Sequence, residues 1–158
     1  MACRSTLAAN RVYPVIETAK PSHIPGIVEL AQQWTREYPS LKPDAGRIHE
    51  AVRQCVSGAQ HFAQVAVEEG RVMGATLALV NNHLWAQRKQ AHIVFWVSNI
   101  PGEGATMLRN CLAWAEPRRG IRVVGMTPDF EMDPRALLLA ERIGLRRNGG
   151  AYLWINGA

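Results

Sequence analysis

Cysteine and long hydrophobic runs are scarce in this sequence. It contains only Cys3, Cys55 and Cys111, which are too few for a disulfide framework or a zinc site and indicate a reducing compartment. No stretch approaches the roughly 18 apolar residues that a membrane span needs, so no membrane association is expected. The first six residues have no long apolar core and no clear cleavage site, which argues against a secretory signal. Together these absences predict a cytoplasmic protein.

The composition also lacks the marks of a disordered or divided chain. Apolar residues make up 47% of the sequence and charged residues 20%, whereas a disordered chain would be poorer in apolar groups. The sequence has no internal repeat and no low-complexity linker. Its length of 158 residues therefore predicts one domain over residues 1–158, with residues 1–11 as a loose lead-in.

A recognisable pattern of metal ligands is missing as well. The histidines have no metal-ligand spacing such as H-x-x-x-H, and no His-Cys-Asp arrangement for nucleophilic catalysis can be located. The histidines are His23, His49, His61, His83 and His92. Cys111 falls on the apolar stripe of a predicted helix and is interpreted as core packing. No metal is therefore expected.

Positive charge, by contrast, is in excess. There are 18 lysines and arginines against 13 acidic residues, which gives a net charge of +5. This favours contact with an anionic partner such as a nucleotide cofactor, a nucleic acid or an acidic protein. The basic pairs at 88–89, 118–119 and 146–147 are interpreted as solvated turns. Because no arginine-rich run carries interleaved aromatic residues, a nucleic acid is not the expected partner.

Hydrophobic periodicity predicts a mixed sheet flanked by helices. Strands are expected at residues 12–18, 62–67, 72–80, 91–99, 121–126 and 146–155. Four helices are expected, between Pro21 and Pro39, from Asp44 to about Gly58, from the loop at 100–104 to Pro117, and from Asp133 to Gly144. The order β-α-α-β-β-β-α-β-α-β indicates an α/β chain with one mixed sheet.

Polar and glycine-containing segments set the expected boundaries. Asp44 is a plausible N-cap, and Gly144 is a plausible C-terminal stop. The run Asn81-Asn82-His83 is expected to end the strand before it, and residues 84–90 are expected to form a polar connection. The segment Asn148-Gly149-Gly150 is expected to form a turn inside or before the last strand.

The segment from Ala91 to Ala115 carries the strongest functional signal. A predicted strand leads into a loop with Gly102 and Gly104, and a predicted helix follows directly. The first turn of a helix presents unpaired N–H groups and the positive end of the helix dipole. A pyrophosphate can bind there if no side chain blocks its approach. The alternative interpretation is that the two glycines only form the turn.

Two spaced motifs point to a known family. The loop reads Asn99-Ile100-Pro101-Gly102-Glu103-Gly104, which has the spacing Q/R-x-x-G-x-G/A, and Leu108 follows in the helix. The segment from Asp133 to Leu145 has the spacing N-x-x-A-x-x-x-Y-x-x-x-G-F, with matches at Asp133, Ala136, Gly144 and Leu145. With the order of elements, residues 12–155 resemble a divergent member of the GNAT superfamily of acyl-CoA N-acyltransferases.

The resemblance implies a fold and a cofactor site. The predominantly antiparallel sheet would splay between its fourth and fifth strands, and the pantetheine arm of acetyl-CoA would lie in that cleft, bonded to backbone groups near Val97 and Asn99. The pyrophosphate would rest on the amides of residues 102–106. These cofactor-binding candidates are Val97, Asn99, Gly102, Glu103, Gly104, Ala105, Thr106 and, from the second motif, Asp133.

The sequence departs from the family pattern at three places. Asn99 replaces the usual Gln or Arg, and the link from strand to loop is shortened. Ala140 stands where the family often has a tyrosine that protonates the leaving thiolate. Because alanine cannot donate a proton, this role is empty or is filled from elsewhere, for example by Tyr152 or by water.

No general base can be assigned from the sequence. On the fourth predicted strand, His92, Val94, Trp96 and Ser98 are expected to share one face by alternation. His92 or Ser98 could then face the acceptor, although the favoured interpretation of His92 is a satisfied or exposed histidine without a catalytic role. Most tryptophans are interpreted as packing, whereas Trp85 and Trp154 could line a partner or acceptor surface.

Two functions remain open. The first is an N-acetyltransferase that moves an acetyl group from acetyl-CoA to a primary amine of a small molecule or protein. The second is a catalytically degenerate chain of the same fold that binds a protein partner, as in compact divergent chains found in bacteriophages. The family also makes a homodimer possible. The helix tip after Asn99, together with Ala140, discriminates between the two hypotheses, because the transferase needs amides there that are not already bonded.

Overall fold

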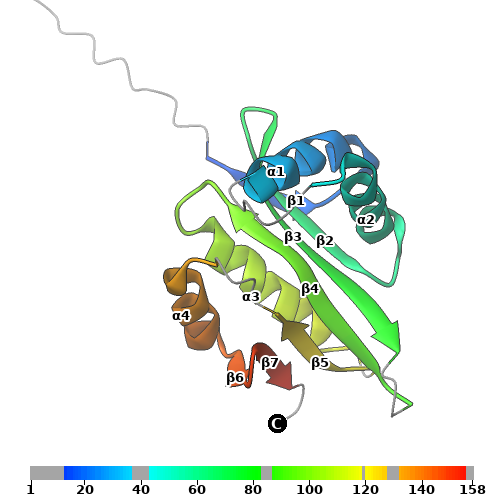
Figure 1. Cartoon of the computed structure of the whole chain (residues 1–158), viewed down its shortest axis with the longest axis vertical. Helices are drawn as coiled ribbons and strands as arrows, with labels where there is room; N and C mark the ends of the chain where they lie inside the picture. Colours follow the sequence, from blue (N-terminus) through cyan, green and yellow to red (C-terminus); the bar gives the residue numbers. More distant parts are fainter. Residues whose placement is uncertain (1–12, 37–42, 83–86, 119, 128–131, 156–158) are drawn as a thin grey trace, which may run out of the picture.

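A computed structural model describes residues 13–36, 43–82, 87–118, 120–127 and 132–155 (Figure 1). Within these residues, seven strands form one sheet in the order β1-β2-β3-β4-β5-β7-β6. The strands are β1 (Val15–Thr18), β2 (Phe62–Glu68), β3 (Arg71–Asn82), β4 (Lys89–Ser98), β5 (Ile121–Met126), β6 (Arg146–Asn148) and β7 (Ala151–Ile155). All neighbouring strands pair antiparallel except β4 and β5, which are parallel. The expected mixed, mostly antiparallel sheet is therefore confirmed.

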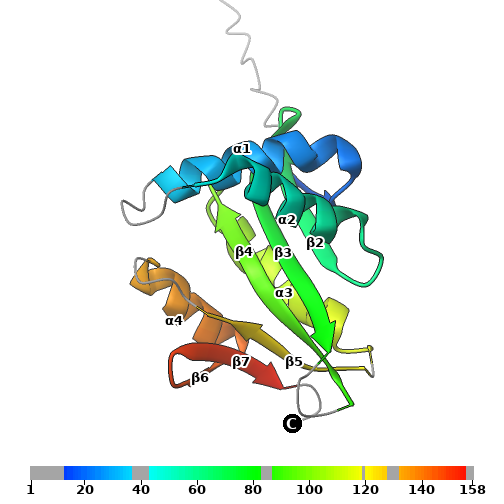
Figure 2. The same cartoon turned by 45° about the vertical axis from the view of Figure 1, so that its right-hand side comes forward.

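Helices cover both faces of the sheet (Figures 1 and 2). A 3₁₀ turn (Pro21–His23) leads into α1 (Ile24–Arg36), and α2 (Ala45–Ser57), α3 (Glu103–Ala115) and α4 (Pro134–Ile143) follow. One buried cluster joins α1 and α2 to the sheet through residues such as Ile27, Val52 and Leu77. A second cluster joins α3 and α4 to the opposite face through residues such as Leu108 and Ala140. None of the described helices is long and apolar enough to cross a membrane.

Capping residues lie at the helix boundaries that the sequence predicts. The Asp44 side chain accepts a hydrogen bond of 3.0 Å from the Arg47 amide at the start of α2. Gly144 ends α4 with a φ of 119°, a left-handed conformation that favours glycine. Strand β5 has the predicted bounds of 121–126. The expected lead-in over residues 1–11 and the end of the first helix at Pro39 lie outside the described residues.

Two expected strand boundaries are wrong. Strand β3 continues through Asn81 and Asn82, which pair with Gln90 and Lys89 of β4, so the polar run does not end the strand and the connection is shorter. Backbone hydrogen bonds extend the ladder even though these side chains are exposed. The expected last strand over residues 146–155 is a hairpin of β6 and β7. The expected turn at 148–150 is confirmed inside this segment, where Gly149 has a φ of 61°.

Candidate functional site

A β-bulge lies in β4 at the point where its pairing with β5 ends. In β4, Ile93 pairs with Ala78 of β3 and Phe95 pairs with Leu77, so Val94 is an extra residue without a partner. A bulge of this kind bends its strand and increases the local twist. The ladder between β4 and β5 ends at Ile93, although β4 itself continues to Ser98. The sheet therefore splays between its fourth and fifth strands, as the family resemblance implies.

The bulge also changes which β4 side chains share a face. His92 pairs with Leu79, which packs against the α1/α2 cluster, whereas Trp96 packs against the α3/α4 cluster. His92 and Trp96 therefore lie on opposite faces of the sheet. The expectation that His92, Val94, Trp96 and Ser98 share one face is wrong, because regular alternation assumes that no residue is inserted.

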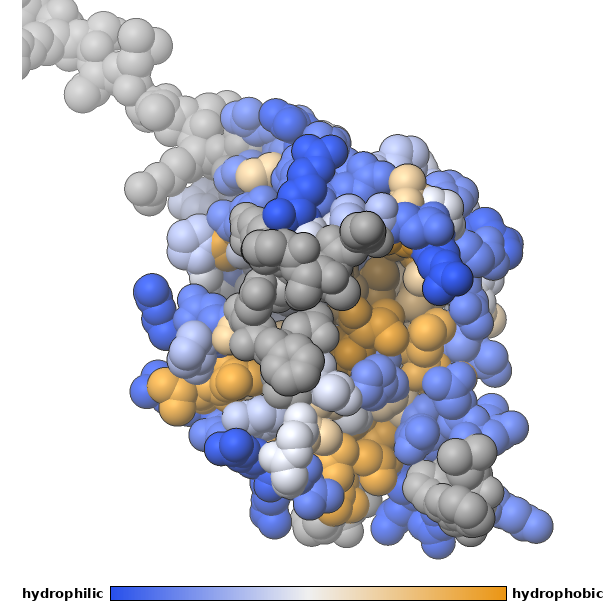
Figure 3. Space-filling view, in the orientation of Figure 1, coloured by the Kyte–Doolittle hydropathy of each residue, from blue (hydrophilic) through white to orange (hydrophobic). Residues whose placement is uncertain are grey.

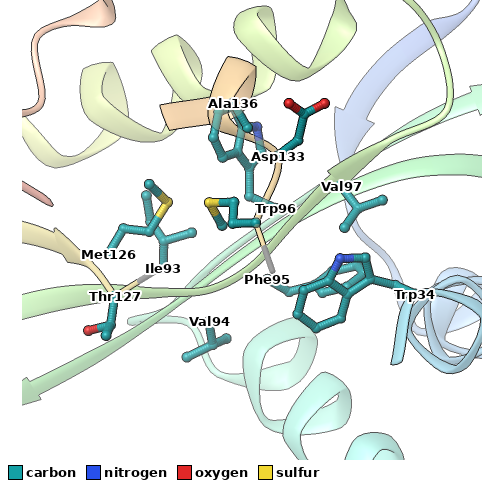
Figure 4. Close-up of a pocket in the computed structure, with 11 residues that line it drawn as sticks. Trp34, Ile93, Val94, Phe95, Trp96, Val97, Met126, Thr127, Asp133 and Ala136 are labelled. Atoms are coloured by element: carbon teal, nitrogen blue, oxygen red, sulfur yellow. The ribbon is translucent and has the colours of Figure 1, made fainter. Parts of the chain in front are cut away.

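The opened sheet forms a cleft with two adjacent parts. The first, here called the helix-tip pocket, has a volume of about 540 Å³. It is lined by Trp96, Ser98, Ile100, Pro101, Gly102, Gly104, Ala105, Asp133, Arg135, Ala136 and Leu139. The second, the apolar pocket, has a volume of about 190 Å³ (Figure 4). It is lined by Trp34, Ile93, Val94, Phe95, Trp96, Val97, Met126, Thr127, Met132, Asp133 and Ala136.

Helix α3 begins at the helix-tip pocket with part of its first turn unpaired. Gly102 is the N-cap, with a φ of 86° and no side-chain cap. The Glu103 amide donates to the Ile100 carbonyl at 3.3 Å, and the Thr106 amide donates to the Gly102 carbonyl at 3.4 Å. Within the described part of the chain, the amides of Gly104 and Ala105 have no acceptor. Two N–H groups at the positive end of the α3 dipole are thus open to the pocket.

The end of β4 fixes the position of this loop. The Trp96 indole Nε1 donates to the Gly104 carbonyl at 2.8 Å. The Ser98 hydroxyl donates to the Ile100 carbonyl at 3.0 Å and accepts from the Ile100 amide at 3.1 Å. The glycine-bearing loop is therefore tethered to β4 by two side chains, which fixes Gly104 and Ala105 in the wall of the cleft.

The predicted cofactor-binding residues are only partly gathered at the cleft. Val97 lines the apolar pocket, and Gly102, Gly104 and Ala105 line the helix-tip pocket. Asn99 instead lines a hollow beside α1, and its amide donates to the Met73 carbonyl at 2.8 Å. Glu103 and Thr106 use their amides within the loop, as described above.

Asp133 lies where the two parts of the cleft meet. Its side chain accepts from the Arg135 amide at 2.8 Å and so caps α4. The carboxylate oxygen is also 3.7 Å from Arg135 Nε. This negative charge is therefore partly balanced by the helix end and by the Arg135 guanidinium.

The three predicted catalytic candidates are not brought together. Ser98 lines the helix-tip pocket. His92 is half-buried before the splay begins, and burial lowers the pKa of its imidazole. Tyr152 is 5% exposed within the α3/α4 cluster and lines neither pocket. Ala140 is fully buried in the same cluster, so the place of the family's tyrosine is part of the core.

No thiol or metal chemistry is evident in the described residues. Cys55 and Cys111 are both buried, and burial raises the pKa of each thiol to about 12, so neither supplies a thiolate nucleophile near neutral pH. Cys111 lies in the core as expected. No described group of three histidine, cysteine or acidic side chains could hold a metal ion. His83, Trp85 and Cys3 lie outside the described residues.

Several residues that line the cleft could not be recognised in the sequence. Trp34 shares the helical spacing of the α1 core residues, so it reads as packing. Met126 and Thr127 lie at the carboxyl end of β5, a position where open α/β sheets often bind ligands. Their position at the end of a predicted strand is the one sequence signal that could have identified these two residues as part of a ligand site.

The fold was compared with proteins of known sequence and structure. No protein-family model and no curated protein matches the sequence. The structure is similar to a GNAT family acetyltransferase from Brucella melitensis in complex with acetyl-CoA, at 15% identity and a TM-score of 0.67, over 93% of this chain and 90% of that one. It is similar to a ribosomal-protein-alanine N-acetyltransferase from Brucella melitensis, at 15% identity and a TM-score of 0.70, over 89% and 99% of the two chains.

A third similar structure was solved with a different bound molecule. It is an aminoglycoside acetyltransferase from an uncultured soil metagenomic sample in complex with sisomicin, at 15% identity and a TM-score of 0.62, over 86% of this chain and 90% of that one. This chain has the GNAT fold, and the resemblance inferred from its two motifs is confirmed for the fold.

Proposed function

We propose that the protein is an acyl-CoA-dependent N-acyltransferase that moves an acetyl group from acetyl-CoA to a primary amine. The observation that carries this proposal is the cleft that begins at the Val94 bulge and ends on the unpaired amides of Gly104 and Ala105. A groove that leads to open N–H groups at a helix N-terminus suits a diphosphate. The solved structures with the same fold include one with acetyl-CoA bound.

The residues at the helix tip fit the pyrophosphate of acetyl-CoA. The Gly104 and Ala105 amides would donate to its oxygens, and Gly102 leaves the approach open because it has no side chain. Arg135 adds a positive charge at the rim of the same pocket. The carboxylate that lines this pocket is that of Asp133, and its charge is partly balanced by the Arg135 guanidinium at 3.7 Å.

The backbone of β4 fits the pantetheine arm. From Val94 to Val97, β4 has no ladder partner on the side of β5. Unpaired backbone N–H and C=O groups at a strand edge can pair with another extended chain that carries amides. The arm of acetyl-CoA contains two amides and would lie along this edge, which leads from the helix-tip pocket to the apolar pocket.

Acetyl-CoA would supply a thioester that is already reactive toward amines. The amine nitrogen forms a bond to the carbonyl carbon, the C–S bond breaks, and the proton lost by the amine is balanced by one gained by the thiolate. Since Ala140 is buried and cannot donate, the protein's contribution is to orient the two substrates. Ser98 and Thr127 are described hydroxyl groups on the cleft wall that could hold a proton-carrying water.

Calorimetric titration with acetyl-CoA tests this function. The wild-type chain should bind with a micromolar-range Kd. Gly104→Glu should abolish the heat, because a carboxylate would project into the helix-tip pocket. Gly104→Ala is the matched control, since an added Cβ would lie 3.6 Å from Ser98 Cβ and 3.7 Å from Trp96 Nε1, which are ordinary contacts. Unchanged binding by Gly104→Glu would contradict the assignment of the pocket.

The buried Ala140 favours a second candidate function, a chain that keeps the fold without catalysis. Such a protein would give no heat with acetyl-CoA and would release no free CoA thiol in the presence of amines. Binding together with slow transfer would instead support the transferase. The two candidates are therefore separated by the same titration followed by a thiol assay.

A further inference from the structure

We infer from the apolar pocket that the acceptor is a primary amine with an aromatic or branched apolar group close to its nitrogen. This inference rests on the proposed acetyl transfer and assigns the class of amine. It is carried by the wall of the pocket, which is built from aromatic, aliphatic and thioether side chains (Figure 4).

The apolar pocket is in the right place for the acceptor. It shares Trp96, Asp133 and Ala136 with the helix-tip pocket, so molecules in the two pockets would meet at these residues. Helix α3 occupies the opposite face of the sheet from Trp34 and Phe95. An amine that enters past Trp34 would therefore approach the cleft from the side away from the pyrophosphate site.

Two aromatic rings form a fixed corner of the pocket. The rings of Trp34 and Phe95 are 5.8 Å apart between centroids and meet edge-to-face at 81°. Phe95 is only 8% exposed, so its ring is held by the α1/α2 cluster. Val94 projects at the bulge with 42% of its surface exposed. Figure 4 shows Trp34 and Phe95 together at one end of the pocket. A flat or branched apolar group gains both burial and ring contact in such a corner.

Charge in the pocket disfavours a polycation. Of the described residues that line it, Asp133 alone is charged, and its carboxylate is already bonded to the Arg135 amide. A polyamine or an aminoglycoside would lose water from several ammonium groups and find one carboxylate in exchange among the described residues of the pocket wall. The net charge of +5 adds a general repulsion.

The surface on this side of the molecule is also apolar at its centre and polar around it. Figure 3 shows hydrophobic groups gathered in a hollow at the centre of the face that α1 and α2 partly cover, with hydrophilic groups around it. Proteins of the same fold act on acceptors as different as a ribosomal-protein alanine and sisomicin, according to their names. The fold does not select the acceptor, so the lining of this pocket does.

A panel of amines tests the inference. Initial rates of CoA thiol release would be measured with 2-phenylethylamine and isoamylamine on one side and with spermidine and kanamycin on the other. We expect kcat/KM to be at least about tenfold higher for the apolar amines, a ratio within reach of one hydrophobic pocket. Trp34→Ala should raise KM for 2-phenylethylamine by about tenfold and leave the Kd of acetyl-CoA unchanged. Trp34→Phe, which keeps a ring, should restore most of the activity.

Each other outcome has a distinct meaning. No binding of acetyl-CoA would overturn the proposed function itself. Binding of acetyl-CoA with faster transfer to spermidine or kanamycin, or with no transfer to either class, would overturn only the acceptor class. A preference for hexanoyl-CoA over acetyl-CoA that Trp34→Ala removes would also overturn it, because the pocket would then hold the acyl chain.

Discussion

The two halves of β4 differ in their neighbours. From Lys89 to Ile93 the strand pairs with β3 on one side and β5 on the other, whereas from Phe95 to Ser98 it pairs with β3 alone. The first half belongs to a continuous sheet and the second half is the wall of a cleft. The residue between the two is the unpaired Val94. A single inserted residue thus separates a structural segment from a binding segment within one strand.

Deletion of Val94 tests this difference most directly, and we expect the largest effect from it. Without the extra residue, Ile93 and Phe95 become consecutive opposite Ala78 and Leu77, so β4 straightens and the cleft narrows. Affinity for acetyl-CoA should fall by roughly a hundredfold, because the unpaired edge is no longer accessible. Calorimetry gives the Kd, and circular dichroism verifies that the sheet is retained.

Val94→Ala is the matched control for the deletion, because it keeps the backbone bulge and removes only an exposed side chain. Its Kd for acetyl-CoA should stay close to that of the wild type. If the deletion bound acetyl-CoA as tightly as Val94→Ala does, the bulge would not be what opens the cleft.

A comparison of two glycines, one beside the cleft and one in a remote turn, is expected to give an effect of intermediate size. Gly102 follows the binding half of β4 and Gly70 lies in the β2–β3 turn, with φ values of 86° and 76° and nothing near an added Cβ. Changing either to alanine should lower the free energy of unfolding by about 1 kcal/mol, because left-handed backbone disfavours a Cβ. Gly102→Ala should in addition weaken acetyl-CoA binding severalfold, and Gly70→Ala should not. Urea unfolding and calorimetry measure the two quantities, and equal binding by both variants would contradict the role of the loop.

The smallest expected effect concerns His92 in the structural half. Burial lowers the pKa of its imidazole from the ordinary value of 6.5. The unfolded chain therefore takes up a proton at a higher pH than the folded chain, so stability falls as the pH drops below about 6.5 toward the folded pKa. Urea unfolding between pH 7.5 and 5 should show a decrease that is smaller in His92→Gln. A larger decrease in the variant would mean that His92 gains stability on protonation.

The elements of the fold could be predicted from the sequence because their signals are local. Asp44 and Gly144 mark helix ends through their own backbone preferences, and β5 is a short apolar run between turn residues. The ends of β3 could not be predicted in the same way. Asn81 and Asn82 are polar, but backbone pairing with β4 decides their conformation. Strand boundaries therefore depend on a partner that lies elsewhere in the chain.

The residues of the candidate site also fall into two groups, those with a local sequence signal and those that depend on a distant partner. Gly102 and Gly104 could be identified because their loop has a recognisable spacing before a helix. The bulge could not, because residues 91–99 read as a regular strand and Val94 is exceptional only in its missing partner on β3. The place of Trp34 in the cleft could not be predicted for a related reason. Its spacing in α1 is that of a core residue, and its contact with Phe95 is tertiary. The acceptor side of the cleft therefore had no sequence signal of its own.

The indole of Trp96 has a consequence for how the protein can be studied. It belongs to the walls of both pockets, and its N–H is held on the Gly104 carbonyl. Its fluorescence emission depends on the polarity of its surroundings, so displacement of solvent by either substrate changes the signal at this one ring. The chain has five tryptophans, so the contribution of Trp96 would be taken as the part of the emission change that Trp96→Phe removes, and occupancy of the cleft can then be followed without a label.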